Sequence, residues 1–138
     1  MAEQSLKRNI FQRIFGISAT ALPQDPDCWT YADGRVQIDL DRAPELARPG
    51  GAVRLEKKDL PERVLVVHGD DGTFHAFANR CRHMGRRLDP VPGTETVQCC
   101  SVSKSTYDYQ GKMLTGAAKG PVAVYAVAAD DGKLTIRL

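Results

Sequence analysis

The sequence contains no apolar run that approaches twenty residues, which excludes a membrane-spanning helix. It also has little net charge, because 19 basic residues against 17 acidic residues leave a formal charge of +2. That balance is too small to indicate nucleic-acid binding by itself. With 42% apolar and 26% charged residues in 138, the composition is instead typical of one globular domain with some additional chain.

Cysteine is also scarce. The chain has four, namely Cys28, Cys81, Cys99 and Cys100, which is too few for a disulfide scaffold at this length. Cys99 and Cys100 are adjacent and therefore poorly placed to bond each other. The pattern favours thiols or a metal site in a reducing compartment, and we expect a cytoplasmic protein.

The first 48 residues are predicted to form an extension that packs on the domain. Residues 5–17 carry apolar side chains at three- and four-residue steps with basic residues between them, which predicts an amphipathic helix. Such a helix packs on the domain or on a second copy of the chain, giving a homo-oligomer, or docks on another partner or a membrane surface. Residues 23–33 have loop chemistry, whereas residues 35–40 alternate as a half-buried strand does.

Residues 49–138 are predicted to form an all-β domain. Residues 63–67 are the most apolar run and indicate a central strand, and Asp71-Gly72 follows as a hairpin turn. Residues 88–93 contain Pro90 and Pro92 and are expected to be loop. Further short strands, separated by turn residues, are expected at 52–55, 73–77, 94–100, 106–109, 112–115, 122–127 and 133–138. This spacing favours an antiparallel β sandwich or barrel.

The residues with the clearest chemistry are Cys81 and His83, two residues apart, and Cys100, after sixteen further residues. Thiolate sulfur and imidazole nitrogen are ligands for zinc and for iron–sulfur clusters. Nearby basic residues such as Arg82 and Arg86 would lower the pKa of a thiol. Cys28 and Cys99 are better interpreted as buried apolar residues.

These loops resemble the Rieske family of [2Fe–2S] proteins, in which Cys-x-His on one loop faces Cys-x-x-His on another. The flanks agree as well: residues 74–77 resemble the family's strand before the first loop, residues 105–108 its aromatic-Asp turn, and residues 111–114 its glycine-containing hairpin. Residues 121–138 resemble its closing strands. The resemblance covers roughly residues 50–138.

The resemblance implies that Cys81 and Cys100 hold the inner iron and that His83 holds the outer iron. The position of the second imidazole falls on Ser103, and the glycine expected next is Lys104. A Ser103 alkoxide, Lys104, a water or a group from another chain could complete the site, as could Cys99 if the loop rearranged. His68 in a turn and His75 on a strand are more simply solvated or hydrogen-bonded than ligating.

The resemblance favours a ferredoxin-like electron carrier, or an accessory protein, over a catalyst acting alone. Its partner would be a redox protein. Rieske oxygenases add a large catalytic domain, for which 138 residues leave no room. Two alternatives remain: a cluster-free module that binds or regulates a partner, and a mononuclear metal site on Cys81, His83 and Cys100 with an open fourth position. No serine–histidine–aspartate set and no phosphate-binding glycine loop is present.

Overall fold

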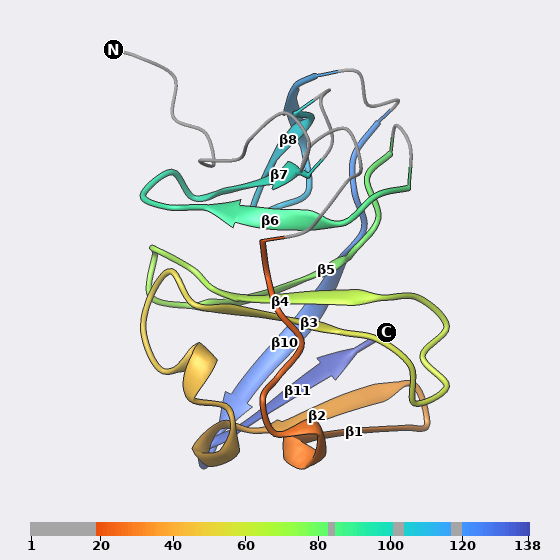
Figure 1. Ribbon diagram of the computed structural model, residues 1–138, viewed down its shortest axis with the longest axis vertical. Coiled ribbons are helices and arrows are strands. Elements are labelled where there is room, and N and C mark those ends of the chain that lie inside the picture. Colours follow the sequence, from red (N-terminus) through yellow and green to blue (C-terminus); the bar gives the residue numbers. More distant parts are fainter. Residues whose placement is uncertain (1–18, 83–84, 101–103, 117–119) are drawn as a thin grey trace.

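Two antiparallel β-sheets make up the part of the chain that the computed structural model describes, residues 19–82, 85–100, 104–116 and 120–138 (Figure 1). The larger sheet has seven strands in the order β1-β2-β11-β10-β5-β4-β3, and the smaller has four in the order β6-β7-β8-β9. This architecture confirms the all-β prediction for those residues.

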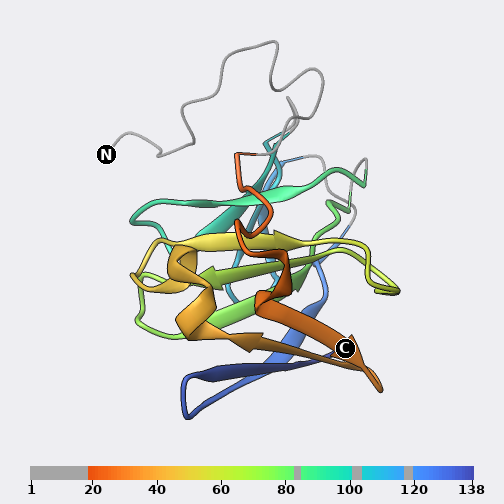
Figure 2. The same cartoon turned by 60° about the horizontal axis from the view of Figure 1, so that its bottom comes forward.

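The larger sheet comprises β1 (Trp29–Ala32), β2 (Arg35–Asp39), β3 (Ala52–Leu55), β4 (Val64–His68), β5 (Phe74–Ala78), β10 (Val124–Asp130) and β11 (Lys133–Arg137). The smaller comprises β6 (Leu88–Val91), β7 (Thr96–Cys99), β8 (Thr106–Asp108) and β9 (Met113–Thr115). Three short 3-10 helices are η1 (Pro26–Cys28), η2 (Leu40–Arg42) and η3 (Pro44–Leu46). The smaller sheet lies across one end of the larger one, and Figure 2 shows the same two layers from a second direction.

Strand β4 is apolar along its length because it faces two cores. Val64 and Val66 belong to a first cluster with residues of β2, β3 and β11. Leu65 and Val67 belong to a second cluster with Phe77 of β5 and residues of β6, β7 and β8. Alternate side chains point to opposite faces of a strand, so a strand buried on both sides needs apolar residues throughout. The second cluster is therefore the contact between the two sheets.

Two segments expected to be loop are strands. Residues 29–32 form β1, which pairs with β2 from Trp29 opposite Ile38 to Ala32 opposite Arg35. Residues 88–91 form β6, although Pro90 has no N–H to donate. Pro90 is tolerated because β6 is an edge strand of the smaller sheet, with a neighbour on one side only. The loop predictions were wrong because they weighed turn residues above pairing.

The N-terminal part of the chain contributes more than one strand to the larger sheet. The larger sheet ends with β3 at one edge and with β1 at the other. Next to β1, β2 pairs with β11 over five residue pairs. The predicted helix at residues 5–17 lies outside the described residues, and the division of the chain at residue 48 stays a prediction. In the described part, no helix is long and apolar enough to cross a membrane.

A short strap formed by residues 19–21 joins the two sheets. The carboxylate of Asp89 on β6 is fully buried and accepts hydrogen bonds from the backbone N–H groups of Ala19 and Thr20, both at 2.9 Å. On the other side, Arg54 of β3 donates from its side chain to the Thr20 carbonyl at 2.9 Å and from its backbone to the Ala21 carbonyl at 3.0 Å. The strap thus bonds to β3 of one sheet and β6 of the other.

A second link between the sheets is ionic. Glu56, directly after β3, accepts two hydrogen bonds from Arg87, directly before β6, at 2.5 and 3.0 Å. Arg54 lies 3.0 Å from the same carboxylate. The hydrogen bond from Arg87 is the main cause that holds the pKa of Glu56 below its ordinary value, with Arg54 contributing and burial opposing. A bidentate Arg–carboxylate pair of this kind fixes geometry as well as charge.

We expect Glu56→Gln to lower the free energy of unfolding at neutral pH by about 1–3 kcal/mol, because it leaves Arg87 and Arg54 without their charged acceptor. A lowered folded-state pKa stabilises the fold above the ordinary glutamate pKa, and that contribution is lost as the pH falls through the folded-state pKa. Urea unfolding should therefore show the difference between wild type and variant shrinking toward acid pH. Glu95→Gln, at an exposed position, is the control, and a pH-independent gap would contradict the role of the ion pair.

Candidate metal centre

The first site loop runs from the end of β5 to the start of β6 and folds back on itself around Cys81. The Cys81 N–H donates to the Arg86 carbonyl at 2.7 Å, and the Gly85 N–H donates to the Cys81 carbonyl at 2.9 Å. Gly85 has φ +69°, in the left-handed region that glycine adopts without strain. These bonds define a tight turn with Cys81 at its start.

The base of this loop is held by Asn79 and Arg63. Asn79 is fully buried, and its Oδ1 accepts the Leu88 N–H at 2.7 Å, which joins the two ends of the loop. The Arg63 guanidinium donates to the carbonyls of Asn79 at 3.0 Å and of Gly85 at 2.6 Å. One cation therefore bridges both ends of the segment that carries Cys81.

The second cysteine approaches the same segment from β7. Leu88 pairs with Cys99 in the β6–β7 ladder, and the Cys100 N–H donates to the Arg87 carbonyl at 3.0 Å. The backbone N–H groups of Cys81 and Cys100 therefore donate hydrogen bonds to the carbonyls of two consecutive residues, Arg86 and Arg87. The fold thus brings the backbones of two cysteines, nineteen residues apart in the sequence, to consecutive residues of the first loop.

All four cysteines are buried with free thiols, in different surroundings. Cys28 packs in the first cluster and Cys99 in the second, which confirms their interpretation as apolar residues. Cys81 also contacts the second cluster, whereas Cys100, equally buried, belongs to neither cluster. Alternation along the chain turns Cys99 and Cys100 in opposite directions.

Arg86 acts on the pKa of the Cys100 thiol in the expected direction, but burial outweighs it. Burial is the main cause that raises the pKa of the Cys100 thiol above its ordinary value, and the Asp89 charge adds to it. Arg86 lowers the pKa, but by less. The buried position outweighs the basic neighbours because a thiolate loses its hydration there.

Tyr107 on β8 connects the smaller sheet to the first loop. Its fully buried hydroxyl accepts the Arg82 N–H at 3.0 Å and lies 3.7 Å from the Cys81 sulfur. Burial raises the pKa of Tyr107, so the phenol keeps its proton at neutral pH. The structure thus places the Tyr107 hydroxyl beside a cysteine sulfur.

The other predicted site residues are distributed as follows. His83 and Ser103 lie outside the described residues, so their part in the site stays a prediction. His68 bonds the Leu46 carbonyl through Nδ1 at 2.9 Å, and His75 bonds Asp71 through Nε2 at 2.8 Å, as expected of hydrogen-bonded histidines. Lys104 is exposed. In the described part of the chain, no three His, Cys, Asp or Glu side chains are grouped closely enough to hold a metal.

Sequence reasoning missed Arg63, Asn79 and Asp89. Arg63 is simply the residue before an apolar strand, and Asn79 the polar residue that follows one, so neither carries a motif. Asp89 falls between Leu88 and Pro90 in a stretch that was expected to be loop. A polar residue at each end of a ligand loop was the available signal, and it is weak because such residues are common at strand ends.

Comparison with known proteins identifies this architecture. Residues 39–126, well over half of the chain, match the family model of the Rieske [2Fe-2S] domain. A two-sheet β domain with cysteine-bearing loops at one end agrees with this match to an iron–sulfur domain family. The chain belongs to the Rieske [2Fe-2S] domain family.

Among curated proteins, the chain is similar to the oxygenase subunit of glycine betaine monooxygenase from Chromohalobacter salexigens, with 37% identity over 71 residues. The corresponding subunit from Pseudomonas aeruginosa is 40% identical over 52 residues. The matched regions are 51% and 37% of this chain but 16% and 12% of those proteins. The chain therefore spans only a small part of the length of these relatives.

Solved structures show the same fold. The ferredoxin of carbazole 1,9a-dioxygenase from Nocardioides aromaticivorans IC177 superposes with a TM-score of 0.55 at 22% identity, over 65% of this chain and 86% of that one. A quaternary ammonium Rieske monooxygenase in complex with L-carnitine superposes with a TM-score of 0.55 at 18% identity, over 90% of this chain and 33% of that one. Both likenesses concern the fold.

The described residues fit the cluster that the family implies. A [2Fe–2S] cluster needs thiolates for its inner iron and hydrogen-bond donors for its sulfurs. Cys81 and Cys100 are both buried, and their backbones bond to the consecutive residues Arg86 and Arg87. The Asn79 side chain, two residues before Cys81, has its amide nitrogen buried with no hydrogen-bond partner. A buried N–H donor without an acceptor at this position suits a negatively charged group that would accept its hydrogen bond.

We expect Arg63→Met to loosen the first loop without unfolding the domain, because the carbonyls of Asn79 and Gly85 lose their shared cation. Amide hydrogen exchange at Cys81 and Gly85 should accelerate roughly tenfold, the effect of losing charged hydrogen bonds worth about 1.4 kcal/mol. Arg35→Met, exposed on β2, is the control and should leave these amides unchanged. Unaltered protection in Arg63→Met would show that the loop holds its shape without the clamp.

Proposed function

We propose that this chain carries a [2Fe–2S] cluster and passes single electrons to a partner redox protein. Cys81 and Cys100 would hold the inner iron and His83 the outer iron, with a non-standard fourth group at or near Ser103. The observation that carries the proposal is the pair of hydrogen bonds from Cys81 to Arg86 and from Cys100 to Arg87, which tie both thiol-bearing backbones to one segment. Similarity to a dioxygenase ferredoxin supports the electron-transfer role.

When bound, the cluster supplies a site that takes up and releases one electron. The chain's own residues would set the conditions. Arg63 and Asn79 hold the first loop, and the second hydrophobic cluster keeps water from the Cys81 side. The Tyr107 hydroxyl, 3.7 Å from the Cys81 sulfur, would donate to it and stabilise added negative charge.

We further propose a cytoplasmic location and a chain that divides into an extension, residues 1–48, and a cluster-bearing domain, residues 49–138. Four buried free thiols support a reducing compartment. The matched family region, which begins at residue 39, supports a domain in the C-terminal part. An enzymatic role is not part of the proposal.

Iron and acid-labile sulfide analysis of anaerobically prepared protein is the primary test. We expect about two irons and two sulfides per chain and the visible absorption of a Rieske centre. The Cys81→Ala and Cys100→Ala variants should contain neither iron nor acid-labile sulfide, because each substitution removes an inner-iron thiolate. The Cys28→Ala variant, which changes a buried cysteine of the first hydrophobic cluster, should keep its iron and sulfide. Iron or zinc without sulfide would favour a mononuclear site, and a stable colourless protein after reconstitution would favour a cluster-free module.

Ser103→His tests the fourth position. If residue 103 occupies the site of the second imidazole, the substitution restores a complete two-cysteine, two-histidine set and should slow cluster loss in air by roughly 10–100-fold, the scale of ligand-shell effects. The half-life of the visible absorption measures it. Ser101→His, in the same loop, is the matched control. An equal effect of both variants, or none, would place the fourth ligand elsewhere.

A further inference from the structure

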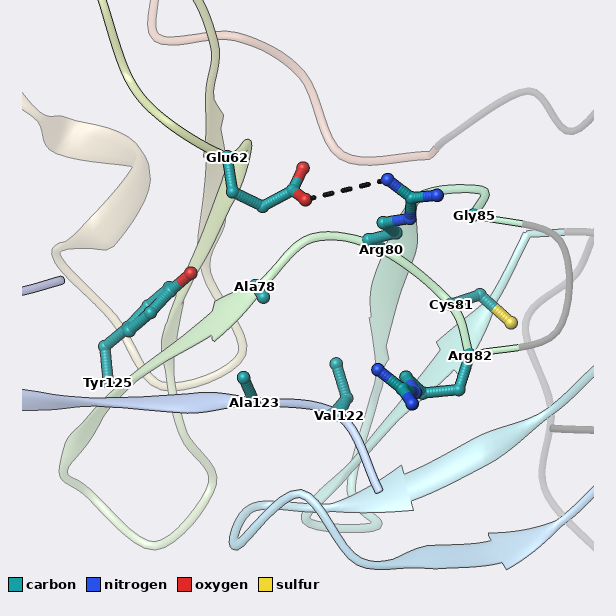
Figure 3. Close-up of a pocket in the computed structure, with 9 residues that line it drawn as sticks. All are labelled: Glu62, Ala78, Arg80, Cys81, Arg82, Gly85, Val122, Ala123 and Tyr125. Atoms are coloured by element: carbon teal, nitrogen blue, oxygen red, sulfur yellow. Dashed lines mark ion pairs between the residues drawn. The ribbon is translucent and has the colours of Figure 1, made fainter. Parts of the chain in front are cut away.

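A pocket lies beside the first site loop. It has a volume of about 640 Å³ and is bounded by the end of β5, the loop around Cys81 and the segment that enters β10 (Figure 3). Its floor is apolar, from Ala78, Val122 and Ala123, and Tyr125 stands at one side. The Cys81 sulfur points away from Tyr125 and Glu62, so the pocket is a neighbour of the metal site rather than the site itself.

Two guanidinium groups at this pocket have donors to spare. Arg82 is exposed and its side chain extends toward Val122 (Figure 3). Among the described residues, no acceptor bonds its guanidinium. Arg80 is 65% exposed and meets Glu62 only at 3.9 Å. By contrast, Arg87 is engaged by Glu56 and Arg63 by two carbonyls. Within the described ranges, the pocket therefore presents one guanidinium without an acceptor, that of Arg82, and one in a long ion pair, that of Arg80.

An apolar contact adjoins these charges. Ala123 is exposed and Tyr125 is half-buried, and both line the pocket next to Arg82 and Arg80. Exposed apolar surface with charged residues at its rim is typical of a protein–protein contact. Electron-transfer complexes use small contacts of this kind, where rim charges steer the encounter.

We propose that this pocket is the docking site for an acidic partner protein, which places a carboxylate side chain against Arg82 and Arg80 and packs apolar surface on Tyr125. The acidic partner would exchange electrons with the [2Fe–2S] centre, so this inference rests on the proposed function. The guanidinium fork matches a carboxylate in a bidentate geometry. Glu62 at the rim disfavours a denser polyanion, and the net charge of +2 gives no broad basic field for nucleic acid.

The test is binding of a dye-labelled hexaglutamate peptide to the full chain, measured by fluorescence anisotropy at low and at high salt. Arg82→Glu should weaken binding about tenfold, because it replaces the unengaged cation by a like charge. Arg137→Glu, an exposed residue of β11, makes the same change in net charge and should alter binding less than about twofold. Glu62→Gln should tighten binding, because it removes the one competing carboxylate among the described lining residues.

An equal loss in Arg82→Glu and Arg137→Glu would overturn the proposal, since it would show that only net charge matters. Tighter binding of an oligothymidylate than of hexaglutamate, dependent on Arg82, would also overturn it in favour of nucleic acid. Peptide binding does not require iron, so the two proposals fail separately. Iron-loaded protein with no Arg82-dependent binding contradicts the docking site alone. Arg82-dependent binding by protein that takes up no iron and sulfide on anaerobic reconstitution contradicts the electron carrier alone.

Discussion

Strand β4 has to satisfy two hydrophobic cores at once, and the rest of the molecule is arranged around that constraint. One face closes the interior of the seven-stranded sheet, and the other receives the smaller sheet. The smaller sheet has only four short strands, which would bury little apolar surface by themselves. Its position, and with it the position of Cys99 and Cys100, depends on Leu65 and Val67 as much as on its own residues.

The loops at the metal site are held by backbone and by charge rather than by a disulfide. Cys81 and Cys100 bond to neighbouring carbonyls, and Arg63 and Asn79 fix the ends of the first loop. These backbone hydrogen bonds leave the cysteine sulfur atoms available as ligands. A disulfide between the two loops would instead restrain them covalently.

Sequence reasoning was most reliable where a single physical pattern decided the structure. Alternation predicted β2 at residues 35–40, observed as Arg35–Asp39, and the Val-rich run predicted the central β4. It failed for β1 and β6, where strand pairing overrode proline and turn chemistry. Spacing alone marked Cys81 and Cys100. The contributions of Arg63 and Asn79 could not be predicted, because each depends on carbonyls brought near by the fold and not on neighbours in sequence.

The strap at residues 19–21 bears on how this domain can be isolated. The family match begins at residue 39, which invites excision of the preceding chain. Such a cut would remove β1 and most of β2 and would leave the Asp89 carboxylate buried with two empty acceptor positions. Removing two hydrogen bonds from a buried carboxylate is costly. The smallest autonomous folding unit of this protein must therefore start upstream of Ala19, some twenty residues before the recognisable family region.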